Sequence, residues 1–152
     1  RWGETARELD ATAIFDVTDA YPRRHTEWHW ASAAGHDPAG RALGLNLCAK
    51  HNDSERAREN VVWLEGVPRP LGAVKFELDP GNPTASAWTI RGERVNLRFD
   101  PSGGRRGDEN LGVVVSRFVQ PYGLFSGEVG YGDETLRLDG VAGVVEDHVA
   151  VW

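Results

Sequence analysis

The chain has 152 residues, 40% of them hydrophobic, and a formal net charge of −6. This length and composition suit one globular domain with its own core and exclude a disordered chain. The acidic balance argues against nucleic acid as a partner, because phosphate binding needs a basic surface. No apolar run reaches the ~20 residues of a membrane-spanning helix. The single cysteine, Cys48, excludes an internal disulfide and favours a cytoplasmic location.

Residues 1–10 carry only two large apolar side chains, Trp2 and Leu9, so the pattern predicts at most a short helix there. The chain does not begin with methionine and contains none. We therefore expect residues 1–10 to be a lead-in that remains from a longer chain, and residues 11–152 to form the domain. A helical turn is predicted at residues 54–60, where Ser54 is a suitable cap.

The rest of the chain has the pattern of short strands separated by turns. Apolar alternation and β-branched runs predict strands at residues 11–18, 25–33, 41–49, 60–65, 73–78, 85–91, 94–99, 111–119, 124–129, 134–138 and 141–152. Tight turns are predicted at residues 92–93, 132–133 and 139–140, a break at 120–123, and a flexible glycine-rich connection at 100–109. About ten short strands without crossover helices are typical of an all-β, antiparallel sandwich or barrel.

A strand rich in histidine and tryptophan follows the first turn. In extended backbone His25, Glu27 and His29 share one face, and Trp28 and Trp30 share the other. If the histidine face looks into the fold, it is a row of metal ligands or of polar contacts to a ligand. If it faces solvent, the tryptophans fill the core. The sequence leaves these alternatives open.

Two carboxylates and an imidazole, Glu146, Asp147 and His148, interrupt an otherwise apolar final strand. A carboxylate beside an imidazole orients it and raises its basicity, as general acid–base catalysis requires. The same cluster is also typical of a structural ion pair. With His25 as a further partner, these residues are the candidate catalytic groups.

Aromatic rings are frequent on the predicted strands, and each contributes about 2–3 kcal/mol when buried. Such rings either fill a barrel or line an apolar pocket, and a few polar groups beside them are typical of a small-molecule site. No metal and no cofactor is predicted. The candidate ligand-binding residues are Trp28, Trp30, Asn46, Tyr122, Phe125 and Trp152.

Other polar residues carry weaker signals. Ser116 and Gln120 have the pattern of ordinary strand residues, and the chain contains no Gly-x-Ser-x-Gly nucleophile elbow. Arg105 and Arg106 are interpreted as solvated surface, because no phosphate-binding helix follows the glycines around them.

Several short motifs follow one another along the chain. They are His25-Thr26-x-Trp28-x-Trp30-x-Ser32, Leu45-Asn46-Leu47, Val62-Trp63-Leu64-Glu65-Gly66-Val67-Pro68, Phe118-x-x-Pro121-Tyr122-Gly123-x-Phe125-x-Gly127 and Gly143-Val144-x-Glu146-Asp147-His148-x-Ala150-x-Trp152. Together they resemble the C-terminal half of domain-of-unknown-function family 2804, a bacterial family. Its members are longer than this chain, which implies that an N-terminal partner domain is missing here.

The family is distantly similar to the lipocalin-like superfamily of AttH-type proteins, carotenoid hydratases and tocopherol cyclases. This similarity implies a lipocalin-like antiparallel β-barrel, or a barrel half, with little helix. Our leading hypothesis is a pocket for an apolar small molecule, lipid- or isoprenoid-like, oriented by Asn46, Tyr122 and His148. One alternative is a metal-free hydratase, cyclase or isomerase with Glu146 or Asp147 as general acid. The other is a structural half-module that packs on a partner domain.

Overall fold

The computed structural model describes residues 8, 11–17, 19, 21, 23–51, 53–54 and 57–152, and none of these lies in a helix. Nine strands form one sheet in the order β6-β5-β2-β1-β11-β10-β9-β8-β7, while β3 and β4 form a separate hairpin. Every pairing is antiparallel, which confirms the predicted fold class. The strands are β1 (His25–His36), β2 (Ala42–Ala49), β3 (Asp53–Ser54), β4 (Ala57–Arg58), β5 (Val61–Leu64), β6 (Val67–Pro70), β7 (Val74–Glu77), β8 (Trp88–Gly92), β9 (Val95–Asn110), β10 (Val115–Tyr131) and β11 (Glu134–Val151).

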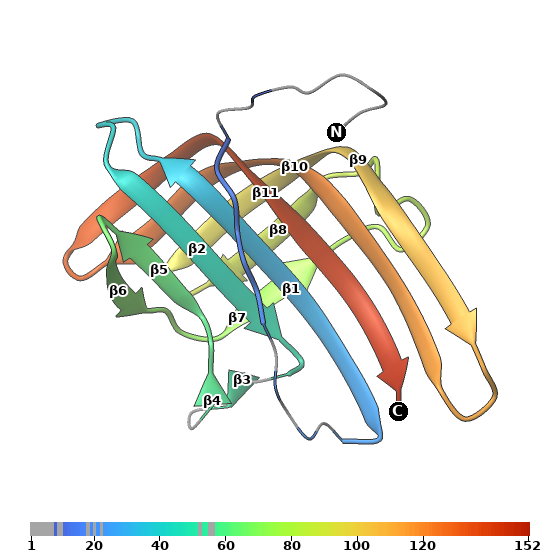
Figure 1. Cartoon of the computed structure of the whole chain (residues 1–152). Coiled ribbons are helices and arrows are strands. Elements are labelled where there is room, and N and C mark those ends of the chain that lie inside the picture. Colours follow the sequence, from blue (N-terminus) through green and yellow to red (C-terminus); the bar gives the residue numbers. More distant parts are fainter. Residues whose placement is uncertain are drawn as a thin grey trace.

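The sheet curls into a half-barrel (Figure 1). Its edge strand β7 returns far enough to contact β2. The long strands β9, β10 and β11 bend through the curl and so belong to both of its layers. This arrangement gives the sheet an inner face and an outer face. Among the described residues no helix is long and apolar enough to cross a membrane.

The inner face carries the hydrophobic core. Trp88, Phe99 and Phe125 are fully buried there, and the rings of Phe99 and Phe125 lie 4.8 Å apart. Trp88 donates its indole N–H to the carbonyl oxygen of Pro83 at 2.8 Å, so its one polar group is satisfied in the core. Leucines and valines from the other strands complete the cluster. The inside of the curl is therefore packed with side chains.

The glycine-rich residues 100–109 form the second half of β9, so the prediction of a flexible connection there is wrong. They pair with β10 along this length. The ring of Phe118 lies over Gly107, and that of Tyr122 lies over Gly103. A Cβ at either glycine would come within 2.4 Å of the facing side chain. The absent side chains leave room for rings, and cross-strand packing holds the segment in the sheet.

The break predicted at residues 120–123 and the turn predicted at 139–140 are also wrong, because β10 and β11 run through them. The pairing register shifts instead, between Tyr122 and Gly123 against β9 and between Phe125 and Ser126 against β11. Extra residues of this kind bend a strand without ending it. The Gly and Pro signals thus mark the places where the long strands curve.

The two predicted tight hairpins are confirmed. Glu93 and Arg94 connect β8 to β9, one residue later than predicted, and Gly132 and Asp133 connect β10 to β11. Gly132 adopts a φ of 61°, in the left-handed region that glycine occupies without steric cost.

Predictions for the N-terminal third are less accurate. Residues 11–17 belong to no strand, so the strand predicted at 11–18 is wrong for them. The helical turn predicted at 54–60 is wrong as well, since residues 53–54 pair with 57–58 in a small hairpin. The short helix predicted at 1–10 lies outside the described residues, apart from Glu8.

Candidate functional site

The two faces of β1 have different surroundings. His29 and Ala31 belong to the buried inner face, whereas Trp28 and Trp30 are half-buried on the outer face. The ring of His29 lies 5.6 Å from that of Phe76 in the core. The alternative in which the tryptophans fill the core and His29 faces solvent is therefore wrong.

Strand pairing places residues of β10 and β11 beside the tryptophans. Trp28 lies opposite His148, and Trp30 lies opposite Glu146, in the register of β1 with β11. Phe118 of β10 lies opposite His148 on its other side. Because side chains alternate along a strand, these five share the outer face.

Glu146 is the centre of a hydrogen-bond network on this face. Its Oε1 accepts the indole N–H of Trp28 at 2.9 Å and lies 3.1 Å from Nδ1 of His148. Its Oε2 accepts the amide of Gln120 at 2.6 Å. The Glu146 side chain is only 12% exposed. Burying a carboxylate is costly unless its oxygens are hydrogen-bonded, and these three partners meet that requirement.

His148 is fixed on all sides. Its Nε2 lies 3.0 Å from Oγ of Ser116, opposite the nitrogen that faces Glu146. Its ring centroid lies 4.1 Å from that of Trp28 and 5.4 Å from that of Phe118. Since Trp28 and Phe118 come from the two strands that flank β11, the imidazole is held between aromatic rings.

Arg105 extends the network to β9. Its Nε–H donates to Oε1 of Gln120 at 2.8 Å, and its guanidinium carbon lies 5.3 Å from the centre of the Phe118 ring. A guanidinium over an aromatic face is attracted by the ring quadrupole. The network therefore runs without a gap from Arg105 through Gln120 to Glu146.

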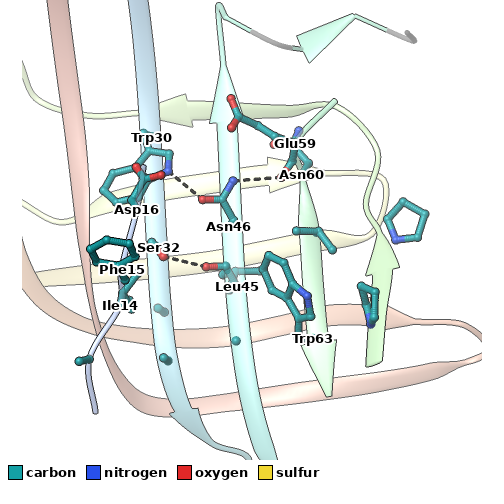
Figure 2. Close-up of a pocket in the computed structure, with 17 residues that line it drawn as sticks. Ile14, Phe15, Asp16, Trp30, Ser32, Leu45, Asn46, Glu59, Asn60 and Trp63 are labelled. Atoms are coloured by element: carbon teal, nitrogen blue, oxygen red, sulfur yellow. Dashed lines mark hydrogen bonds between the residues drawn. The ribbon is translucent and has the colours of Figure 1, made fainter. Parts of the chain in front are cut away.

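A second branch starts at Trp30, and Figure 2 shows its geometry. The indole N–H of Trp30 donates to Oδ1 of Asn46 at 2.8 Å. The Asn46 amide in turn donates to the carbonyl oxygen of Glu59 at 3.0 Å. Both indoles of β1 thus have their N–H groups engaged within the protein, so what they add to the groove is the apolar surface of their rings.

Two adjoining cavities of about 740 Å³ each lie over this face, and together they form the outer groove. They share Asp16, Trp30 and Glu59. The first cavity extends over β2 to Trp63 on β5 and is drawn in Figure 2. The second is lined by Asp16, Thr26, Trp28, Trp30, Cys48, His51, Glu59, Arg105, Phe118, Gln120, Glu146, His148 and Trp152.

Residues 11–17 run across the front of the sheet (Figure 1), and Ile14, Phe15 and Asp16 border the first cavity (Figure 2). Phe15 nevertheless remains 91% exposed, so this segment touches the groove without closing it.

Asp147 lies on the opposite side of the sheet from Glu146 and His148. Its Oδ1 lies 3.2 Å from Nε2 of the buried His29. The hydrogen bond with His29 lowers the pKa of the Asp147 carboxyl, which partial burial alone would raise. Asp147 therefore belongs to a hydrogen-bonded pair with His29 at the border of the core.

The structure brings together six of the residues singled out from the sequence. Those that border the outer groove are Trp28, Trp30, Asn46, Glu146, His148 and Trp152. Trp152 is attached to β1 by its indole N–H, which donates to Oγ1 of Thr26 at 3.3 Å.

Four candidates lie elsewhere. Phe125 is fully buried in the core, and Asp147 contacts His29 behind the sheet. Tyr122 is 56% exposed on the outer face and borders neither cavity, and His25 is exposed at the start of β1. The arrangement therefore assembles half of the proposed catalytic set with most of the ligand-binding set.

Sequence reasoning did not assign Arg105, Phe118 and Gln120 to the groove, although all three line its second cavity. It also did not assign Ser116, which borders neither cavity but contacts His148. A usable signal was present, since Ser116, Phe118 and Gln120 alternate with period two on one strand. Arg105 could not be placed because its strand was read as a loop.

The first histidine row does not converge on a metal. Glu27 forms an ion pair with Lys50, while His29 pairs with Asp147 on the other side. Across the described ranges, no three histidine, cysteine, aspartate or glutamate side chains are grouped so as to hold a metal ion.

The family model for "Domain of unknown function (DUF2804)" matches residues 3–152. The chain belongs to this family. No curated protein and no solved structure is significantly similar to it. The DUF2804 match covers all four strands that contribute to the Glu146–His148 network, β1, β9, β10 and β11.

Proposed function

We propose that the outer groove of this DUF2804 domain binds a small molecule with an apolar body, lipid- or isoprenoid-like, and one anionic end. The proposal rests on the hydrogen bonds of the two indole N–H groups in the groove. Trp28 and Trp30 have their N–H groups satisfied by Glu146 and Asn46, so only ring faces remain for a ligand. Cavities of about 740 Å³ are within the usual range for small-molecule sites.

The anionic end is assigned to Arg105. Asn46 and His148 have both of their polar atoms engaged within the protein, so they hold the rings in place. Arg105 borders the second cavity and uses its Nε–H for Gln120. The terminal N–H groups of the guanidinium form a fork that matches a carboxylate. A long-chain carboxylic acid is therefore the simplest ligand of this kind.

Titration of tryptophan fluorescence with dodecanoate and with dodecanol tests the proposal. We expect saturable binding of both, with the acid tighter. Arg105→Gln should remove the preference for the acid. Arg106→Gln is the matched control, because the guanidinium of Arg106 contacts Thr84 outside the groove. Equal affinities for acid and alcohol in the unmodified chain would contradict the role of Arg105.

The apolar body is tested separately. Trp30→Ala removes a wall shared by the two cavities and should weaken dodecanoate binding about 10-fold or more, as expected for losing one aromatic contact. Leu124→Ala, at an exposed apolar residue of β10 that borders neither cavity, should leave the affinity unchanged. Absence of saturable binding would favour the structural half-module instead.

A second candidate function is a metal-free acid–base enzyme. The contact between Glu146 and His148, with both side chains less than one-sixth exposed at 12% and 15%, favours it. Asp147, on the far side of the sheet, takes no part in this version. Glu146 accepts three donors and would serve as an anion that orients His148, which is then the group that moves a proton.

A further inference from the structure

The direction of every hydrogen bond around Glu146 follows from two groups that can only donate. The Nε–H of Arg105 donates to Oε1 of Gln120, so the amide nitrogen of Gln120 is the donor to Oε2 of Glu146. The indole N–H of Trp28 donates to Oε1 of Glu146. Both carboxylate oxygens of Glu146 are thereby acceptors.

This polarity fixes the tautomer of His148. Nδ1 lies 3.1 Å from Oε1 of Glu146 and carries the proton, because the carboxylate oxygen accepts. In the neutral imidazole the lone pair is then on Nε2. Oγ of Ser116 lies 3.0 Å from Nε2, so the Ser116 hydroxyl donates to it.

We infer that Ser116, His148 and Glu146 form a nucleophile, a general base and its positioning residue, respectively, and that they cleave carboxylic esters with an apolar acyl chain. Both nitrogens of His148 are engaged, and the Ser116 oxygen, which donates its proton to Nε2, keeps its lone pairs for a substrate. The order and polarity are those that activate serine hydrolases. Ser116 borders neither cavity and meets the groove through His148, so the choice of an apolar acyl chain rests on the proposed function.

The reaction needs only water as a co-reactant. Oγ of Ser116 bonds to the ester carbonyl carbon while its proton passes to Nε2 of His148. The bond from that carbon to the alcohol oxygen then breaks, and the alcohol leaves with the proton from Nε2. Water attacks the acyl-serine, gives a proton to Nε2, and the acid is released as Ser116 regains its hydrogen. Glu146 remains a carboxylate throughout.

Turnover should be slow, and this determines the choice of test. β10 is paired with β9 at Glu109 and with β11 at Ala150 around Ser116, so backbone N–H groups there are engaged in the sheet. Backbone donors that stabilise the oxyanion supply a large part of the rate acceleration in serine hydrolases. A reagent that traps the nucleophile therefore reports on Ser116 more directly than a steady-state rate does.

The test is covalent capture by an octyl fluorophosphonate. Oγ of Ser116 bonds to phosphorus, fluoride leaves, and the proton passes to Nε2 of His148. Mass spectrometry of the intact chain and of its peptides should find one adduct, on Ser116. Ser116→Ala should abolish it, and His148→Gln should slow it about 100-fold or more. Ser102→Ala, at an exposed serine of the neighbouring β9, should label like the unmodified chain.

The positioning role of Glu146 is tested by measuring the tautomer of His148, which a general loss of stability would not change. Nitrogen-15 NMR of the His148 ring should show the proton on Nδ1, with loss of this preference in Glu146→Gln and its retention in Glu146→Asp. Labelling of Ser116 should be slow in Glu146→Gln and retained in Glu146→Asp. Glu146→Gln thus serves as a second test variant if His148→Gln does not fold.

Three outcomes decide between the two proposals. Absence of an adduct on Ser116, in a chain that unfolds cooperatively and binds dodecanoate, would overturn the serine inference alone. An adduct that forms equally fast in His148→Gln would overturn it as well. An adduct on Ser116 in a chain that does not bind dodecanoate would support the serine inference and contradict the proposed function.

Discussion

Trp28 and His148 stack on each other across the β1–β11 pair, with ring centroids 4.1 Å apart and planes inclined at 38°. The same indole donates its N–H to Glu146, which also faces His148. One side chain of β1 therefore fixes both the imidazole and its carboxylate partner.

Trp28→Phe keeps an aromatic ring beside His148 and deletes the donor to Glu146. We expect the free energy of unfolding to fall by about 1.5 kcal/mol, the loss typical of a hydrogen bond to a charged group. Urea unfolding followed by circular dichroism measures this change. Trp152→Phe, which deletes a longer hydrogen bond to neutral Thr26, is the control and should cost less. Equal losses would mean that Glu146 gains little from Trp28.

The hydrogen bond between His29 and Asp147 should make stability depend on pH. The hydrogen bond with His29 lowers the folded-state pKa of Asp147 below the unfolded value of about 3.9, so the unfolded chain binds this proton more tightly. The contribution is present above the unfolded value and is lost as pH falls through the folded value. Asp147→Asn should therefore be less stable than the unmodified chain at neutral pH, with a deficit that shrinks below about pH 4.

Urea midpoints at neutral pH and near pH 3 measure this difference. Asp108→Asn is the control, because the carboxylate of Asp108 is 63% exposed beside Arg117 and should contribute little at either pH. A deficit in Asp147→Asn that is the same at both pH values would show that its charge is not what stabilises the chain.

Phe125→Leu tests whether the core contributes to stability but not to ligand binding in the groove. Phe125 is fully buried against Phe99, on the inner face of the sheet. We expect a loss of stability on the order of 1 kcal/mol from the smaller side chain. Dodecanoate affinity, measured by fluorescence well below the unfolding temperature, should stay unchanged. A clear drop in affinity would place Phe125 in the binding site, as the sequence alone predicted.

Gly107→Ala tests the packing that keeps the glycine-rich segment in β9. A Cβ at this position would lie 2.4 Å from Cε1 of Phe118, so the ring must leave its place over Gly107. Overpacking of this kind typically costs about 1–3 kcal/mol. Gly72→Ala is the control, since a Cβ there meets nothing within 4 Å. Equal stability of the two variants would show that Phe118 adjusts freely.

Strand β1 shows how much of the site could be predicted from the sequence. The alternation of side chains correctly placed His29 on one face and Trp28 and Trp30 on the other. Because both faces carried rings and polar groups, the sequence did not predict which face points into the core. Ala31 and Ala33 continue the His29 face and are fully buried, and this small apolar continuation was the usable signal.

The errors in β9 and in the strands after it have a common cause. Gly and Pro were interpreted as turn residues, which is their usual role in isolation. Here Gly103 and Gly107 accommodate rings from β10, and such a role depends on a partner strand that the local sequence does not identify. The site residue Arg105 was missed for the same reason. The lipocalin-like relationship stays a prediction, since no solved structure is significantly similar.

The core and the outer groove occupy opposite sides of one layer of backbone. Replacements among the groove side chains need not disturb the packing of Trp88, Phe99 and their neighbours. Natural variation at groove positions can therefore change what this surface recognises while the core side chains stay the same.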